Sequence, residues 1–261
     1  MEEINYFMVE EKADEGSLRR GKQPQEIGFF WREREVTLHL LPSSWFEEPD
    51  GGGKGESEGP PAPRERRRRQ ARKRALAGKL ARYVDSRGKD PDTVWISPGL
   101  EPCFPSYRPP LPTPSLAALF WREQPFREIL ILWAEESFWT KEERWQEAFL
   151  DECFRDLNGL FLVGKEPGEN GRLWEKLYEE SGLSACSART MPRTDGRKTA
   201  VLDLRAQKRP PAEELPPACL YLDLTSDVEK QRLLRKIRPD ISYQSVRNYL
   251  DTAFKARYNA I

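Results

Sequence analysis

The sequence predicts an α/β protein with a Rossmann-like, mostly parallel, three-layer C-terminal domain, a small N-terminal β region and a basic helix. Two continuous apolar runs, ILILWA at residues 129–134 and LFLV at residues 160–163, are typical of strands covered on both faces. A pattern with helical spacing follows each run. Two strand–helix units in succession favour a parallel sheet with right-handed crossovers.

The chain has 261 residues, which is long enough for one large or two modest domains. No apolar run approaches the ~18 residues of a membrane span, and the first residues, MEEINYFMVEEK, are acidic where a signal peptide is basic. We therefore expect a cytoplasmic protein without a membrane partner. The four cysteines form no C-x-x-C pair and the chain has one histidine, so neither a zinc site nor a disulfide framework is expected.

Residues 1–46 are expected to form the small β region. Residues 4–9 form a short apolar segment, and residues 28–41 contain a strict alternation of apolar and polar residues. In that alternation Val36, Leu38 and Leu40 share one face, and His39 lies on the other. We expect a small antiparallel sheet in which His39 points away from the three aliphatic side chains.

Residues 47–63 consist mainly of Gly, Pro, Ser and charged residues without an apolar anchor, which indicates a flexible linker. Residues 64–90 form a basic segment, which has a helical pattern from about residue 65 to residue 84. Leu76, Leu80, Tyr83 and Val84 share one face of this helix. Its second half can dock on the protein, whereas its first two turns have nothing apolar to bury.

The charge of the chain is strongly asymmetric. Residues 64–89 contain twelve basic and two acidic residues, so this window carries +10 and the rest carries −10, because the total is zero. This pattern indicates either a polyanionic partner or docking onto the protein's own acidic surface. The window has one aromatic residue, Tyr83, and so lacks the interleaved aromatics of single-strand binders. The candidates for phosphate contacts with a nucleic acid are Arg66, Arg67, Arg68, Arg69, Arg72, Lys73 and Arg74.

Residues 91–125 are expected to be a proline-rich connector. A short strand at residues 93–96 precedes seven prolines within the seventeen residues 98–114, which argues against both a helix and a central strand. We expect an extended segment on the surface. It contains a P-x-x-P spacing at residues 109–112, but Arg108 is not placed as in a typical SH3 ligand.

Residues 126–261 are expected to form the Rossmann-like domain. A capping box predicts its first helix from residue 140 to about residue 157, and a second helix runs from about residue 172 to Gly182. The remaining expected strands cover residues 184–190, 199–204 and 219–224, and a turn signal at residues 194–197 favours one antiparallel pair. The last two expected helices cover residues 226–237 and begin near residue 242.

The sequence offers two candidate ligand-binding turns in this domain. The turn after the second strand is rich in glycine and contains Lys165 and Arg172, but it lacks the P-loop spacing and holds two glutamates, so a long exposed turn explains it better. Asp223, Thr225 and Ser226 follow a later strand, at the edge where open α/β sheets bind ligands. The alternative is that Ser226 only caps the next helix.

No cofactor, metal or catalytic residue is indicated. The turn after the first strand, residues 135–139, has two glutamates and no glycine, so it does not suit a dinucleotide diphosphate. Hydrolase, zinc-protease and kinase motifs are absent from the sequence. Three hypotheses stay open: a binding, regulatory or scaffolding protein with a protein or polyanion partner; a nucleic-acid-associated protein that uses residues 64–89; and an enzyme or small-molecule sensor that uses the strand-end crevice.

Overall fold

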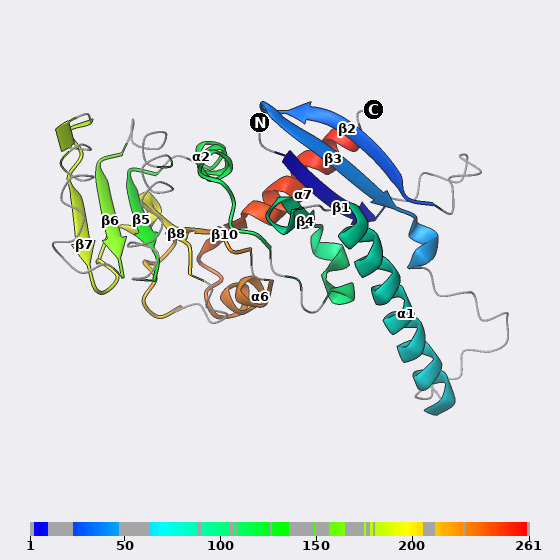
Figure 1. Cartoon of the computed structure of the whole chain (residues 1–261). Helices are drawn as coiled ribbons and strands as arrows, with labels where there is room; N and C mark the ends of the chain where they lie inside the picture. The colour runs from blue at the N-terminus through cyan, green and yellow to red at the C-terminus, as the bar shows by residue number, and fades with distance from the viewer. Residues whose placement is uncertain are drawn as a thin grey trace. The chain divides into compact units, whose positions relative to one another are not determined.

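The computed structural model divides the chain into two compact units, Met1–Pro110 and Leu111–Ile261 (Figure 1). No helix in the described part of the chain is long and apolar enough to cross a membrane. The structure describes residues 3–9, 23–46, 63–87, 90–104, 107, 109–125, 127–135, 149, 157–164, 175, 178–179, 181–205, 212–226 and 228–259.

Unit 1 contains a four-stranded sheet with the order β2-β3-β1-β4. β2 and β3 form an antiparallel hairpin, and the turn residues Arg32 and Glu33 have φ values of 48° and 64°, as a two-residue hairpin loop requires. The strands are β1 (Glu3–Val9), β2 (Gln25–Trp31), β3 (Arg34–Leu41) and β4 (Val94–Ile96).

The expected antiparallel sheet is correct only for this hairpin, because β1 pairs in parallel with both β3 and β4. β1 is a nearly continuous buried run rather than an alternating one. Such a run is typical of a central strand that is covered on both faces. His39 does lie on the opposite face of β3 from Leu38 and Leu40, but it is buried as well.

The basic segment forms α1 (Pro63–Arg87), whose second half packs on this sheet. Leu80 and Val84 are buried and belong to one apolar cluster with Phe7 of β1 and Ile96 of β4. The expected docking of the apolar stripe is therefore confirmed. Figure 1 shows the first turns of α1 extending beyond the sheet. Apart from Pro63, the expected linker lies outside the described residues.

The proline-rich segment differs from the expected extended connector. β4 joins the sheet of unit 1, and two 3-10 helices, η2 (Pro91–Thr93) and η3 (Pro98–Cys103), flank it. The last of the seven prolines in residues 98–114, Pro114, begins helix α2 (Pro114–Arg122), and the side chain of Thr113 caps it by accepting a hydrogen bond from the backbone N of Leu116. Proline fits the first helical turn because the N–H that it lacks has no intrahelical partner there.

Unit 2 contains a six-stranded sheet with the order β10-β9-β8-β5-β6-β7, in which every pair is parallel. A mixed α/β fold is therefore confirmed. The strands are β5 (Ile129–Trp133), β6 (Gly159–Val163), β7 (Ala185–Ala188), β8 (Thr199–Asp203), β9 (Leu220–Asp223) and β10 (Ser242–Ser245).

The antiparallel pair expected at residues 194–197 is wrong. This turn is the 3-10 helix η5 (Gly196–Lys198), and it leads into β8, which pairs with β5 and β9. Gly196 is required for packing, because a Cβ atom there would lie 1.8 Å from the carbonyl oxygen of Pro217. The side chain of Asp195 caps η5 by accepting a hydrogen bond from the backbone N of Arg197.

Two helices follow β9 and β10. α6 (Val228–Ile237) agrees with the expected helix, whereas α7 (Val246–Tyr258) begins later than expected, because residues 242–245 form the strand β10. Ser245 caps α7 by accepting a hydrogen bond from the backbone N of Asn248. The helices expected at residues 140–157 and 172–182 lie mostly outside the described residues. Gly182 has a φ of 70°, and its N–H donates to the carbonyl oxygen of Tyr178, as at a helix C-terminus.

Candidate functional site

The same tripeptide, Leu-Asp-Leu, spans the ends of β8 and β9, and the last residues of the two strands, Asp203 and Asp223, are paired in register. Both side chains have no exposed surface. Because the strands are parallel, the two carboxylates lie side by side at the carboxyl end of the sheet. This is the edge where ligands of open α/β sheets bind.

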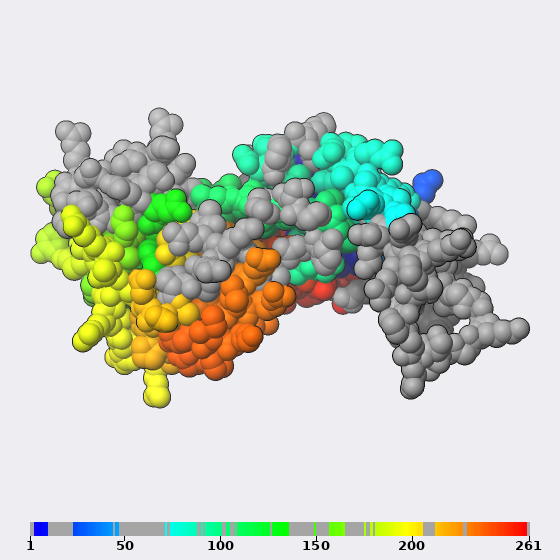
Figure 2. Space-filling view, turned by 90° about the horizontal axis from the view of Figure 1, so that it is seen from below, coloured from blue at the N-terminus to red at the C-terminus, as the bar shows by residue number. Residues whose placement is uncertain are grey.

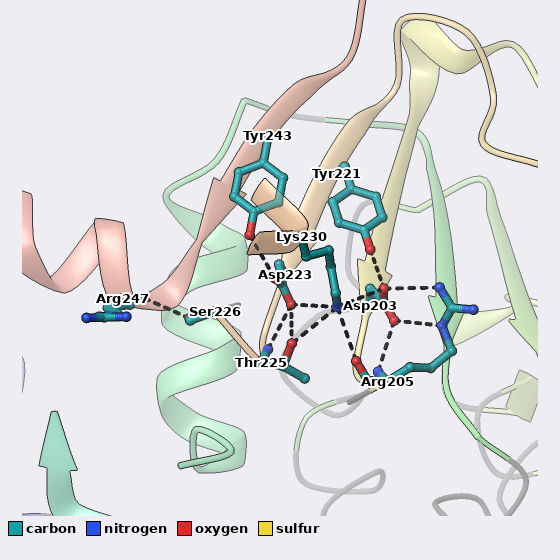
Figure 3. Close-up of polar contacts among 9 residues, drawn as sticks. All are labelled: Asp203, Arg205, Tyr221, Asp223, Thr225, Ser226, Lys230, Tyr243 and Arg247. Carbon is teal, nitrogen blue, oxygen red and sulfur yellow. Dashed lines mark hydrogen bonds and ion pairs between the residues drawn. The ribbon is translucent and has the colours of Figure 1, made fainter. Parts of the chain in front are cut away.

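A lysine from α6 lies between the two carboxylates (Figure 3). The Nζ atom of Lys230 is 3.2 Å from Oδ2 of Asp203 and 3.2 Å from Oδ1 of Asp223. It also donates to the hydroxyl of Thr225 and to the carbonyl oxygen of Arg205. Since Lys230 has no exposed surface, this contact ties the first turn of α6 to the ends of two strands.

Asp203 is surrounded by further donors. The Nε and Nη2 atoms of Arg205 donate to its two oxygens at 2.9 and 3.2 Å, and the backbone N of Arg205 donates as well. The Tyr221 hydroxyl donates to Oδ2. The guanidinium of Arg205 also lies over the ring of Trp133 at the end of β5, with 3.2 Å between its central carbon and the ring centroid. Asp203 thereby connects β8 with β5, β9 and α6.

Asp223 has an equivalent set of donors from the other side. Its Oδ1 accepts from the hydroxyl and the backbone N of Thr225 at 2.6 and 3.0 Å. Its Oδ2 accepts from the Tyr243 hydroxyl of β10 at 2.7 Å. The rings of Tyr221 and Tyr243 are stacked with centroids 5.8 Å apart. We call Asp203, Arg205, Tyr221, Asp223, Thr225, Lys230 and Tyr243 the strand-end cluster.

Ser226 connects the end of β9 to α7 instead of capping α6. Its φ is 54°, and its hydroxyl accepts a hydrogen bond of 3.1 Å from the backbone N of Arg247. α6 begins two residues later, at Val228. The capping role expected for Ser226 is therefore wrong: its hydroxyl instead fixes the first turn of α7.

The strand-end cluster shifts the pKa values of two of its members, Asp203 and Tyr221. Burial alone would raise the pKa of Asp203, but the ammonium of Lys230 and the guanidinium of Arg205 outweigh burial, so this pKa lies below its usual range. Burial and the neighbouring carboxylates, Asp203 first, hold the pKa of Tyr221 well above its usual range. A general acid or base works best with a pKa near the working pH. The pKa values of Asp203 and Tyr221 are both shifted away from neutral pH, so neither group is suited to that role.

The four charges of the strand-end cluster balance, with two carboxylates against one ammonium and one guanidinium. Where a cation could bridge the two aspartates, Lys230 lies instead. In the part of the chain that the structure describes, no three His, Cys, Asp or Glu residues gather as metal ligands. Chemically, the strand-end cluster is suited to fixing the ends of β8, β9 and β10 relative to α6.

The sequence-predicted candidates in unit 2 have different outcomes. Asp223 and Thr225 lie in the strand-end cluster and Ser226 lies beside it, whereas Lys165 and Arg172 are outside the described residues. Sequence reasoning missed Asp203, Arg205, Tyr221, Lys230 and Tyr243. The repeated Leu-Asp-Leu at two strand ends was a usable signal for Asp203. Nothing local distinguishes Lys230 from the exposed basic residues of the same helix.

The basic helix is the second candidate region. Its docking contacts are apolar, and among its described side chains only Arg87 forms an ion pair, 3.1 Å from Oε1 of Glu26. Arg74, Lys79 and Arg82 are exposed, and Figure 2 shows the second half of α1, in cyan and turquoise, on the surface. The side chains of the other candidates, Arg66, Arg67, Arg68, Arg69, Arg72 and Lys73, lie outside the described part, although their backbone is helical.

The last turns of α1 pack over the single histidine of the chain. The His39 ring stacks on Phe7, with ring centroids 4.2 Å apart, and its Nδ1 is 3.4 Å from the Tyr83 hydroxyl. That hydroxyl donates to Glu26, which also pairs with Arg87. Burial, partly offset by Glu26, lowers the pKa of His39. A neutral imidazole therefore lies under the docked end of the basic helix.

Comparisons with protein-family models, with curated proteins and with solved structures gave no match. The geometry and charge of α1 and of the strand-end cluster are therefore the basis for a functional proposal.

Proposed function

We propose that this protein binds nucleic acid through α1, by sequence-independent contacts with phosphates. The observation that carries this proposal is that the two halves of the helix differ: one half packs on the sheet and the other carries most of the basic residues. The second half docks through Leu80 and Val84, and the first turns extend from the sheet with a dense basic sequence. α1 contains eleven basic and two acidic residues. Such a helix attracts a polyphosphate backbone by charge alone.

The described contacts favour this proposal over docking of the basic residues on the protein's own acidic surface. If self-docking were the role of the charges, the docked half would pair its basic side chains with carboxylates. Instead, the docked half packs mainly through apolar side chains, and only one of its described basic side chains, Arg87, pairs with a carboxylate, that of Glu26. Arg74 and Arg82 are exposed, and Lys79 lies over the ring of Trp45. Surface cations without a carboxylate partner are available to phosphates at little desolvation cost.

For unit 2 we propose a Rossmann-like architecture. If its six strands are numbered by their order in the chain, their order across the sheet is 3-2-1-4-5-6. The direction of this order reverses between β5 and β8. Ligands of this fold class bind outside the carboxyl ends at that reversal. Here Glu135 follows β5 and the charge-balanced strand-end cluster follows β8 and β9. These features support a structural role for this edge more than phosphate binding or catalysis.

The decisive experiment measures binding of a fluorescently labelled DNA duplex over a series of salt concentrations. The test variant changes Arg66, Arg67, Arg68 and Arg69 to glutamine. The matched control removes four exposed basic residues from unit 2 by changing Arg193, Arg232, Arg235 and Lys236 to glutamine. Both variants lose the same charge, so only its position differs.

We expect the slope of log K against log salt to flatten by about 3 to 4 in the test variant, since each lost phosphate contact contributes about 0.9. The control should keep most of the wild-type slope. Equal slopes in both variants would show that net charge, rather than α1, determines binding. No measurable binding of the wild type at low salt would refute the proposal.

A further inference from the structure

β2 is an edge strand of the sheet in unit 1, with β3 as its sole neighbour among the described strands. In a hairpin with a two-residue loop, the residues that flank the loop, Trp31 and Arg34, form a hydrogen-bonded pair. The alternation along β2 then directs the backbone N–H and C=O groups of Glu26, Gly28 and Phe30 away from β3. These groups form a template for another strand.

The side chains along this edge are unusual for a monomeric protein. Phe30 has 69% of its surface exposed, and a Cβ atom placed on Gly28 would find nothing within 4 Å. The two residues lie two positions apart, on the same face of the strand. An exposed aromatic ring therefore lies next to a glycine whose face is open to solvent.

We propose that β2 pairs with β2 of a second copy of this chain in an antiparallel arrangement centred on Phe29. In this register Gly28 faces Phe30 of the second copy, so each phenylalanine ring covers the glycine of the other chain. Ile27 faces Trp31. The outward backbone groups of Gly28 and Phe30 then form the new hydrogen-bonded pairs.

Self-complementarity of the strand supports the second copy as the occupant. In this register Gly28 faces Phe30, Ile27 faces Trp31 and Phe29 faces its own copy, so apolar side chains of β2 meet apolar residues of the second copy. A register centred on Gly28 instead would place Phe30 opposite the Glu26 carboxylate and leave two glycines facing each other. The strand is thus self-complementary in one register, as a two-fold interface requires.

The pairing has a structural consequence for α1. In antiparallel pairing, residues opposite each other point to the same side, so the two-fold axis is perpendicular to the sheet. Both copies of α1 then lie on the same side of one continuous eight-stranded sheet. The pairing does not depend on the proposed nucleic-acid binding, but two helices on one side would strengthen such binding through effective concentration.

The experiment measures the mass of the full-length protein by sedimentation over a wide concentration range. The wild type should form dimers, and Phe30→Lys and Gly28→Pro should each weaken dimerisation roughly tenfold or more. Proline at position 28 removes an outward N–H group without removing a bond to β3. The control is Ile237→Lys, which changes an exposed apolar side chain in α6 (55% exposed) and should leave the dimer unchanged.

The register is tested by cross-linking. Phe29→Cys should form an intermolecular disulfide under mild oxidation, because the centre of the register places position 29 opposite itself at non-hydrogen-bonded spacing. Ile27→Cys should not, because position 27 faces position 31. A wild type that stays monomeric at high concentration overturns the proposal, and so does a dimer that survives both β2 substitutions. A cross-link at position 27 instead of position 29 overturns the register. Circular dichroism establishes that each variant is folded.

Discussion

The Nζ atom of Lys230 lies 3.2 Å from Oδ2 of Asp203, and neither side chain is exposed. Two charges that are both removed from water depend on each other, because either one alone would be buried without compensation. Asp223 lies at the same distance from the same ammonium group. The stability of unit 2 should therefore respond strongly to loss of Lys230.

We expect Lys230→Met to lower the free energy of unfolding by about 3 to 5 kcal/mol, because it leaves two buried carboxylates facing each other. Urea denaturation followed by circular dichroism measures this change. Lys236→Met is the matched control, since Lys236 is exposed on the same helix, and its effect should stay within about 0.5 kcal/mol. Similar small effects of both substitutions would show that the strand-end cluster contributes little to stability.

Acidification should weaken the strand-end cluster through Asp203. The pKa of this carboxyl is lower in the folded protein than in the unfolded chain, so its contribution to stability is present above the unfolded value and is lost as the pH falls through about 4 toward the folded value. Denaturation at neutral pH and at about pH 3 measures the loss. Asp203→Asn should reduce the pH dependence over this range. An unchanged dependence in that variant would assign the acid sensitivity to other carboxyls.

Patterns within a single element predicted the structure well. The apolar runs of β5 and β6, and the stripe of Leu80 and Val84 on α1, agree with the described elements because burial of a face leaves a periodic signal in the sequence. Pairing direction left a weaker signal. The position of β1 between β3 and β4 depends on contacts between segments far apart in the chain.

The strand-end cluster was predicted only in part for the same reason. Asp223 and Thr225 are neighbours in sequence and at a strand end, so local reasoning found them. Asp203 is twenty residues earlier, and it joins Asp223 only because β8 and β9 pair in register. Lys230 is a lysine in a polar helix sequence, and its burial is decided by the tertiary packing of α6.

Two glycines should respond in opposite directions to alanine. Gly196→Ala places a Cβ atom 1.8 Å from the carbonyl oxygen of Pro217, so the backbone must move and stability should fall by about 1 to 3 kcal/mol. At Gly78, within α1, a Cβ atom meets nothing within 4 Å, so Gly78→Ala should add roughly 0.5 to 1 kcal/mol through helix propensity. Thermal unfolding measures both changes. A stabilising Gly196→Ala would contradict the described contact between η5 and the loop before β9.

Mild acidification should loosen the docking of α1. Within the described part of the chain, the charged and titratable groups around the His39 ring are Glu26 from β2 and Tyr83 and Arg87 from α1, and Asn5 from β1 contacts Nε2. Because burial, the largest effect, lowers the folded pKa of His39, the unfolded state binds a proton first as the pH falls. Stability contributed by the neutral ring is complete above about 6.5 and is lost as the pH falls from there toward the folded value.

Hydrogen exchange of the backbone amides in the second half of α1 measures this loosening directly. We expect faster exchange at about pH 5.5 than at about pH 7.5 once the intrinsic pH dependence of exchange is removed. His39→Gln should abolish the difference, and because His39 is the only histidine of the chain, no other imidazole can replace it. Ser86→Ala, an exposed substitution on the same helix, is the control and should keep the wild-type pH response. A response that persists without His39 would place its origin in another titrating group.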